Sequence, residues 1–304
     1  MGTAATDAIT LRTPFSGRTF QIVGSPDDIS VFGATKKASG FWEPQIMRLM
    51  SRLVRPGHVC LDIGANLGAH TLALAELARG GAVYAFEPST VNMSFLAQNV
   101  GRNGLDNVRL QKLALGAQAG TQSFTHLVGM EGCSFLTPND PIEDVLLRSW
   151  GQNLDRITED VLVITLDQWA ENNMIDKIDF VKMDVEGSEL SVIEGGTKTL
   201  GRFRPPLILE FNKHALNLYY GINPKLFFDR LTDLYSHFYI IPDSQEERPR
   251  RIASFADIAS LIDNPQHWWV DMLCLAAPFE DVAAREEGKS GPAGWLKSIF
   301  GQGA

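Results

Sequence analysis

The segment Val59–Thr71 constrains the fold more than any other part of this sequence. An apolar run ends around Asp62, Gly64 and Gly68 follow four residues apart, and a helical spacing of apolar residues begins at once. The pattern predicts a buried strand that turns sharply into a helix. Glycine is favoured where a turn needs a positive φ or where a ligand approaches the backbone closely. We therefore expect a turn that holds a ligand against the main chain, with an ordinary strand–helix turn as the simpler alternative.

Size and charge narrow the class of protein and of ligand. The 304 residues, with 44% hydrophobic and 21% charged content, can bury a full core, so we expect one large α/β domain with additions. A formal net charge of -9 disfavours a nucleic-acid surface, because such surfaces depend on clustered Lys and Arg. We expect a small-molecule or glycan acceptor and no nucleic-acid partner.

Cysteine usage and the first residues bear on location. Cys60, Cys133 and Cys274 lie far apart, and Cys60 falls in an apolar strand, so we interpret all three as reduced thiols. The first residues lack the basic and apolar pattern of a secretion signal, and no long uncharged segment could cross a bilayer. These patterns predict a cytoplasmic protein without stable membrane insertion. The oligomeric state stays open.

Strand and helix patterns alternate along most of the chain. Residues 9–34 contain two short alternating stretches that predict a small β element, and residues 42–54 have helical spacing. The strands predicted after them are 59–63, 83–86, 108–114, 161–166, 178–183, 206–211, 238–241 and 268–276. The predicted helices are 69–79, 89–102, 166–172, 188–200 and 228–234. Such alternation predicts a doubly wound, mostly parallel sheet with right-handed crossovers.

Three segments differ from this pattern. We expect an N-terminal β element and helix over residues 1–56, a main domain over 57–282 and a flexible tail over 283–304. Gly and Pro interrupt the main domain between about 127 and 160. Long irregular segments inside compact domains are often functional lids, so we expect an inserted lid there.

Glu87 ends the second predicted strand of the main domain, about 20 positions after the first glycine. At that spacing an acidic side chain can accept hydrogen bonds from both ribose hydroxyls of a nucleotide. A dinucleotide site would have G-x-G-x-x-G, whereas this turn has Gly64, Asn66 and Gly68. A nucleoside without a pyrophosphate fits the turn better. A surface Glu that caps the next helix is the alternative for Glu87.

These motifs, in this order, resemble those of the FkbM family of S-adenosylmethionine-dependent methyltransferases. The resemblance rests on four blocks, Asp62-Ile63-Gly64-Ala65-Asn66-x-Gly68, Phe86-Glu87-Pro88, Asp179 to Glu189, and Pro206 to Glu210. It covers roughly residues 57–212, with weaker likeness to about 276. It implies the Rossmann-like class I methyltransferase fold, a seven-stranded sheet with an antiparallel last strand, and usually O-methylation of a sugar or natural product.

The resemblance also implies where the cofactor binds. Gly64, Asn66 and Gly68 would line its methionine and ribose part, and Glu87 would hold the ribose. Asp62 would face the methionine ammonium group, directly or through water. Leu113 and Ala114 are weaker candidates near the adenine edge. Asp184, at the end of a strand where the sulfonium methyl is expected, is the strongest acidic candidate near the reaction.

Four residues are candidates for catalysis. An alcohol attacks the methyl group poorly unless a nearby carboxylate or His removes its proton. Asp184 and Glu186 lie at the carboxyl end of a strand, where α/β sheets bind ligands. Glu210 either has a structural partner or faces the acceptor, and His214 is a possible base or a solvated loop residue. Glu189 is interpreted as an acid at a helix N-terminus.

Several alternatives stay open. Asp184, Glu186 and Glu210 could bind a divalent ion, but their spacing does not demand one, so we expect no metal site. Tyr219-Tyr220 and Trp268-Trp269 could provide apolar faces for a sugar ring, or they pack in the core. The sequence predicts an O-methyltransferase for a hydroxyl of a sugar, a glycan or glycolipid precursor, or a secondary metabolite. The alternatives are N-methylation of a small molecule or protein, and a non-catalytic cofactor-binding partner protein.

Overall fold

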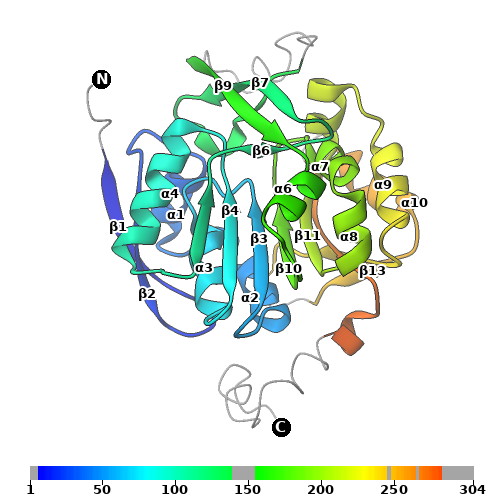
Figure 1. The fold of residues 1–304 in the computed structure, drawn as a ribbon, viewed down its shortest axis with the longest axis horizontal. Helices are drawn as coiled ribbons and strands as arrows, with labels where there is room; N and C mark the ends of the chain where they lie inside the picture. Colours follow the sequence, from blue (N-terminus) through cyan, green and yellow to red (C-terminus); the bar gives the residue numbers. More distant parts are fainter. Residues whose placement is uncertain (1–5, 139–154, 245–247, 265–266, 283–304) are drawn as a thin grey trace.

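A central sheet with helices on both faces forms the body of the molecule, and a smaller sheet covers one end of its strands (Figure 1). The computed structural model describes residues 6–138, 155–244, 248–264 and 267–282. The predicted doubly wound, mostly parallel α/β fold is confirmed. The predicted tail over 283–304 lies outside the described residues, and the predicted division into domains stays a prediction.

The central sheet has eight strands among the described residues, in the order β13-β12-β14-β11-β10-β3-β4-β5. Their bounds are Arg250–Ile252, His237–Ile241, Trp269–Leu275, Leu207–Asn212, Phe180–Met183, Val59–Ile63, Ala82–Phe86 and Val108–Gln111. Neighbours from β5 to β11 are parallel, and β14 lies antiparallel between β11 and β12. The resemblance implied seven strands, and the short edge strand β13 is the eighth.

Helices cover both faces of this sheet. One face is covered by α1 (Val31–Ala38), α2 (Pro44–Leu53), α3 (Ala69–Leu77) and α4 (Thr90–Arg102). The other is covered by α6 (Leu166–Asn172), α7 (Glu189–Gly195), α8 (Thr197–Phe203), α9 (Pro224–Thr232) and α10 (Phe255–Ile262). Each face has its own buried apolar cluster, so the strands of the sheet are apolar on both sides.

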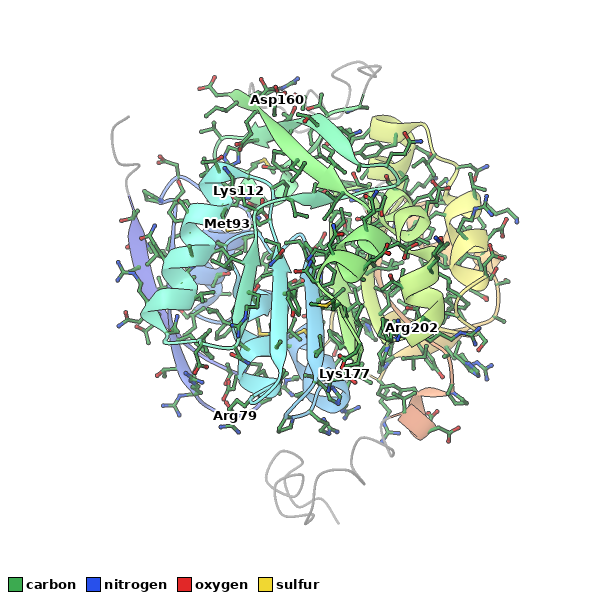
Figure 2. The ribbon with its side chains drawn as sticks, viewed as in Figure 1. Arg79, Met93, Lys112, Asp160, Lys177 and Arg202 are labelled. Carbon is green, nitrogen blue, oxygen red and sulfur yellow. The ribbon has the colours of Figure 1, made fainter. Side chains whose placement is uncertain are left out.

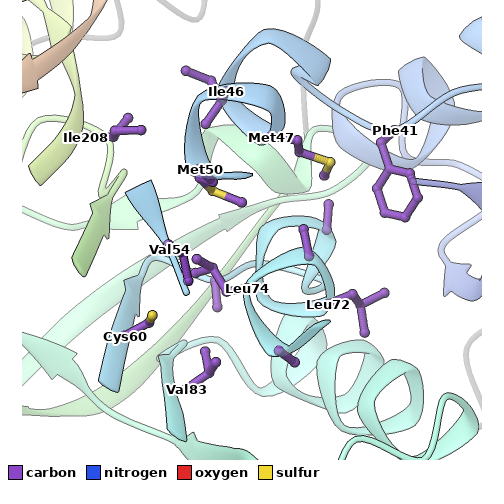
Figure 3. Close-up of a cluster of buried hydrophobic side chains, with 14 of the residues drawn as sticks. Phe41, Ile46, Met47, Met50, Val54, Cys60, Leu72, Leu74, Val83 and Ile208 are labelled. Carbon is purple, nitrogen blue, oxygen red and sulfur yellow. The ribbon is translucent and has the colours of Figure 1, made fainter. Parts of the chain in front are cut away.

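The first of these clusters explains why α2 belongs to the fold. Figure 3 shows Ile46 and Met50 of α2 gathered with Leu74 of α3, above the sheet residues Cys60 and Val83. Ile46 and Met50 are fully buried. Truncating such a side chain to Ala typically costs about 2–5 kcal/mol. The helix therefore anchors residue 43, which precedes it, at the end of the sheet.

The predicted N-terminal β element is the hairpin of β1 (Asp7–Arg12) and β2 (Thr19–Gly24). Its second strand packs along α4, where the side-chain amide of Asn99 makes two hydrogen bonds to the backbone of Val23. Asn99 is fully buried, so these bonds satisfy polar groups that would otherwise be unpaired.

The predicted lid is more ordered than its sequence indicated. A four-stranded sheet in the order β6-β9-β7-β8 covers the carboxyl ends of the central strands, with bounds Ala114–Leu115, Arg156–Ile164, Gly120–Leu127 and Phe135–Leu136. In Figure 2, Arg79 and Lys177 mark the amino ends of the strands, and Asp160 of β9 lies at the opposite, lid-covered end. Residues 139–154 of the predicted insertion lie outside the described residues.

Other differences from the predicted elements have local causes. The predicted strand 108–114 is two strands, β5 and β6, because the chain leaves the central sheet and enters the lid between them. The predicted helix 188–200 is α7 and α8, which meet at Gly196. A Cβ at Gly196 would lie 2.7 Å from Leu166 Cδ2, so the interruption lets α6 pack closely. Helices α1 and α10 were not predicted.

Candidate active site

A cavity of about 480 Å³ lies beneath the lid, where the carboxyl ends of β3, β4, β10 and β11 meet the first residues of β14. Phe124 and Leu136 of the lid line it from one side. Ligands of open α/β sheets bind at this edge, because the strand ends and the loops after them converge there.

Most of the predicted site residues line this cavity. They are Gly64, Asn66, Glu87, Leu113, Ala114, Asp184, Glu186, Glu210 and His214. Asp62 and Gly68 do not line it. The topology therefore brings together segments that are up to 150 residues apart in sequence.

The two glycines of the turn are required mainly by the protein's own packing. Gly64 has a φ of 84°, and a Cβ on it would lie 1.7 Å from the Asp184 carbonyl oxygen. Gly68 has a φ of 96°, and its Cβ would lie 2.6 Å from Leu96 Cδ1. Gly64 thus joins the turn to the end of β10, and Gly68 seats α4 against α3. Packing therefore accounts for both glycines, and their contact with a ligand stays a prediction. Gly64 also lines the cavity.

Asp62 is buried within β3 and accepts a hydrogen bond from Thr71 Oγ1 at 2.5 Å. Burial raises its pKa to about 6, although the Thr71 bond acts in the opposite direction. Its side chain ties the strand to the helix that follows. Asp62 does not line the cavity. Its carboxyl group is therefore not placed for a direct contact with a methionine ammonium group bound there.

Glu87 is buried on the cavity wall and braces the glycine turn. Its Oε2 accepts a hydrogen bond from the Asn66 N–H at 2.8 Å, and its Oε1 accepts one from the Ser89 N–H at 2.9 Å. Burial raises its pKa to about 7, against the effect of these two bonds. The Asn92 side chain also donates a hydrogen bond to this carboxylate. A carboxylate has about four acceptor sites, so one remains for a hydroxyl. The alternative of a surface residue is wrong, since only 4% of Glu87 is exposed.

Three carboxylates gather opposite the glycine turn. One oxygen each of Asp184, Glu186 and Glu210 lie within 4.8 Å of one another. Asp184 Oδ2 accepts a hydrogen bond at 3.0 Å from Lys182 Nζ, and Glu210 accepts one at 3.0 Å from Asn212 Nδ2. Of the two alternatives for Glu210, its place on the cavity wall favours the residue that faces an acceptor.

The charges of this cluster are only partly compensated. Burial, together with Glu210 and Asp184, raises the pKa of Glu186 well above its ordinary value. Burial and Asp184 do the same for the pKa of Glu210. Burial lowers the pKa of Lys182, but Asp184 and other carboxylates outweigh it and keep this buried amine charged. One ammonium group therefore faces several acids.

The sequence patterns did not indicate four further acids on the cavity wall, Glu43, Glu131, Asp243 and Asp271, or the histidine His70. Glu43, Asp271 and His70 all line the cavity. His70 Nε2 lies 3.4 Å from Glu43 Oε2, and burial lowers the pKa of His70 well below its ordinary value. Asp271 interrupts the apolar strand β14, and that interruption was the available signal. Glu43 gave no signal beyond the Pro that follows it.

Backbone strain is concentrated at this cavity. Among the described non-glycine residues with positive φ, Glu43, Asn66 and Glu186 all line it, with φ of 47°, 52° and 51°. A left-handed conformation costs an ordinary residue roughly 1–2 kcal/mol. Such strain is typical of functional sites, where the surrounding structure fixes a side chain in a required direction.

Aromatic rings form another part of the wall. Trp268, Trp269 and Tyr219 line the cavity, and the His214 ring stacks on Trp268 with centroids 4.6 Å apart. Tyr220 instead packs behind the wall, where it accepts a hydrogen bond from Ser188 and donates one to the Leu136 carbonyl. Three of these four candidates therefore line the cavity, and each has one ring face stacked on a neighbouring ring.

Two further polar residues, His126 and Glu189, lie away from the cavity wall. His126 is buried in β7, with its Nδ1 3.5 Å from both Ser89 Oγ and Ser134 Oγ. Glu189 is fully buried in the first turn of α7 and accepts a hydrogen bond from the Val185 N–H, which supports its structural interpretation.

None of the helices in the described part of the chain is long and apolar enough to cross a membrane. The cytoplasmic location stays a prediction.

Comparison with known proteins assigns the family. The Methyltransferase FkbM domain matches residues 62–228, which is more than half of the chain. The chain belongs to the FkbM methyltransferase family. The matched region begins at Asp62 and includes the glycine turn, Glu87 and the carboxylate cluster.

Curated relatives carry methyltransferase names. The 2-O-methyltransferase NoeI of Sinorhizobium fredii is 29% identical over 52% of this chain and 65% of its own length. The 31-O-demethyl-FK506 methyltransferase FkbM of Streptomyces tacrolimicus is 30% identical over 47% of this chain and 60% of its own. The hexuronic acid methyltransferase AglP of Haloferax volcanii is 25% identical over 60% of this chain and 65% of its own. The matches thus span less than two thirds of these relatives.

Proposed function

We propose that this chain transfers a methyl group from S-adenosylmethionine to a hydroxyl of a sugar, a glycan or glycolipid precursor, or a secondary metabolite. The observation that carries the proposal is the close contact between Gly64 and the Asp184 carbonyl. It makes the predicted cofactor turn and the carboxylate cluster two walls of one cavity. Family membership and the names of the O-methyltransferase relatives support the same reaction.

The cofactor side has residues that fit a nucleoside. The Glu87 carboxylate keeps acceptor capacity for a ribose hydroxyl, and Asn66 holds the turn in a left-handed conformation beside it. Leu113 and Ala114 give an apolar edge for the adenine. When bound, the cofactor supplies an electrophilic methyl group on a sulfonium. The residues of the chain supply orientation and a proton acceptor.

The acceptor hydroxyl must approach the methyl group in line with the sulfur, so positioning accounts for much of the acceleration. Asp184 is fixed by Lys182 at the junction of the two walls and would orient the hydroxyl. Glu186 would take the proton, because the surrounding acids and burial make it a stronger base than an ordinary carboxylate. Glu210 and His214 would contact the acceptor. The Asp184, Glu186 and Glu210 oxygens could also hold a divalent ion, but the reaction as proposed does not require one.

Label transfer tests the proposal. The protein is mixed with methyl-labelled cofactor and a panel of sugars, glycans and phenolic or alcoholic metabolites, in the presence of a chelator. We expect label on a hydroxyl oxygen of at least one acceptor. Binding of S-adenosylhomocysteine without transfer to any hydroxyl would contradict the proposal and favour the non-catalytic alternative. Label on nitrogen alone would favour N-methylation.

The proton acceptor has its own test. Transfer should slow as the pH falls through the raised pKa of Glu186, because the protonated carboxyl cannot accept the hydroxyl proton. In Glu186→Gln the rate should be lower and this dependence on pH should disappear. A Gln variant that keeps the acid limb of the wild-type profile would remove Glu186 from this role.

A further inference from the structure

The charges on the cavity wall are unusually one-sided. Its described lining contains eight carboxylates and two histidines, but no Lys or Arg. The cofactor side accounts for Glu87, and Asp184 and Glu186 lie where the reaction is proposed. Five acids remain, which are Glu43, Glu131, Glu210, Asp243 and Asp271. We call Glu43, Glu210 and Asp271 the acidic wall.

The acidic wall includes a costly pair. Glu210 of β11 and Asp271 of β14 are direct cross-strand partners in the antiparallel register. Like charges directly opposite each other destabilise a sheet. The nearest buried cation, Lys182, already donates a hydrogen bond to Asp184 and cannot compensate all of these acids. Such a pair is expected where a bound cation relieves the repulsion.

A second observation is independent of the acids. His70 is nine-tenths buried and lines the cavity, and its Nε2 has no hydrogen-bond partner within the described chain. A neutral imidazole nitrogen can accept a hydrogen bond. Glu43 Oε2, beside it, also lacks a hydrogen-bond partner among the described residues. Unused acceptors from two elements therefore meet at one place on the wall.

The shape of the lining favours an organic cation over a metal ion. Trp268 and Trp269 lie on the cavity wall with ring centroids 5.5 Å apart, and Trp42 also lines the cavity. Aromatic faces attract organic cations and pack against sugar rings. A hydrated divalent ion would gain little from such rings. An ammonium group offers three donors to a wall that consists of acceptors.

We infer that the acceptor of this enzyme carries a protonated amine, as an amino sugar does, and that Glu43, Glu210, Asp271 and His70 bind that ammonium group beside the tryptophans. The inference rests on the proposed function, since it names the acceptor class of the same site. A protonated amine has no lone pair, so the wall also directs methyl transfer to oxygen. An anionic hexuronic acid, the substrate class in the name of AglP, would be repelled by this wall.

Matched sugars test the inference by calorimetry on protein saturated with S-adenosylhomocysteine. Glucosamine, N-acetylglucosamine and glucuronic acid share one ring and differ in charge. We expect glucosamine to bind at least about tenfold more tightly than N-acetylglucosamine, and glucuronic acid to bind most weakly. Equal binding of glucosamine and N-acetylglucosamine would overturn the inference.

Variants locate the effect. Glu210→Gln and Asp271→Asn should each reduce glucosamine affinity about tenfold and reduce N-acetylglucosamine affinity by a smaller factor. Asp160→Asn, on the exposed strand β9 of the lid, is the control and should change neither. A preference for glucosamine that survives both wall variants would overturn the assignment. So would sugar binding that requires added Mg²⁺ and is lost with chelator, because the acids would then hold a metal.

Failure of the cationic-acceptor inference can be distinguished from failure of the proposed methyl transfer. Affinity for S-adenosylhomocysteine and label transfer are measured on the same preparations. Tight cofactor binding and transfer to neutral sugars alone would retain the proposed reaction and reject the cationic acceptor. A preference for the amine without any cofactor binding would reject the methyl donor instead.

Discussion

The two sides of the cavity are built differently. At the glycine turn, Glu87 and Asn66 are neighbours in the fold and their polar groups are satisfied by nearby backbone. On the acidic wall, Glu210 and Asp271 face each other as like charges, and unused acceptors remain on Glu43 and His70. A site that binds one fixed cofactor can be satisfied in advance. A site that compensates a ligand's charge has to leave its own charges unsatisfied until that ligand binds.

The largest effect is expected from a substitution at the contact between the two sides of the cavity. Gly64→Ala places a Cβ 1.7 Å from the Asp184 carbonyl oxygen, in addition to the strain of a φ of 84°. We expect a loss of at least about 3 kcal/mol in the free energy of unfolding, from strain plus overpacking. Denaturant unfolding measures it.

Gly57 is the matched control for that variant. It has the same φ of 84°, but a Cβ there meets no atom within 4 Å. Gly57→Ala should therefore cost only the backbone strain, about 1 kcal/mol. Equal losses of unfolding free energy in the two variants would show that the contact with the Asp184 carbonyl does not affect stability.

The next largest effect should separate catalysis from cofactor binding. Asp184→Asn keeps the shape of the side chain but removes the charge that Lys182 compensates. We expect the rate of transfer to fall about 10²-fold or more, while affinity for S-adenosylhomocysteine changes only a few fold. Single-turnover kinetics and calorimetry measure the two quantities. A fully active variant would move the reaction centre away from Asp184.

The smallest predicted effect on ligand binding concerns Glu87, on the glycine-turn side of the cavity. Because burial raises the pKa of Glu87 to about 7, its carboxyl is largely protonated at pH 6 and ionised at pH 8. Affinity for S-adenosylhomocysteine should rise about tenfold over that range, since the ionised form accepts the ribose hydrogen bond. In Glu87→Gln this dependence should be flat and binding weaker. A wild-type pH dependence retained in the Gln variant would assign it to another acid.

Stability without ligand should show the opposite trend with pH. The folded pKa of Glu87 lies above its ordinary value of 4.5, so the folded state binds the proton more tightly than the unfolded chain does. The free energy of unfolding should therefore fall as the pH rises from about 4.5 to about 7. The difference between wild type and Glu87→Gln isolates this contribution from that of the buried Asp62 nearby.

The sequence by itself determined the fold class and the family, and it predicted which residues hold the cofactor. Regular alternation predicts a parallel sheet, and the turn, Glu87 and the end of β10 follow strands whose carboxyl ends share one edge. These are local patterns, since each candidate stands within a few residues of a strand end. Gly68 shows the limit of such patterns, because no local pattern distinguishes space for a ligand from space for Leu96.

Only the tertiary structure decided the acidic wall. Glu43 comes from the residue before α2, Glu210 from β11 and Asp271 from β14, and no spacing in the sequence relates them. The antiparallel placement of β14 beside β11 sets Asp271 against Glu210, and the packing of α2 on the sheet brings Glu43 to the same cavity. Repulsion between charges depends on distance in space, so a site defined by such repulsion appears only when the chain is folded.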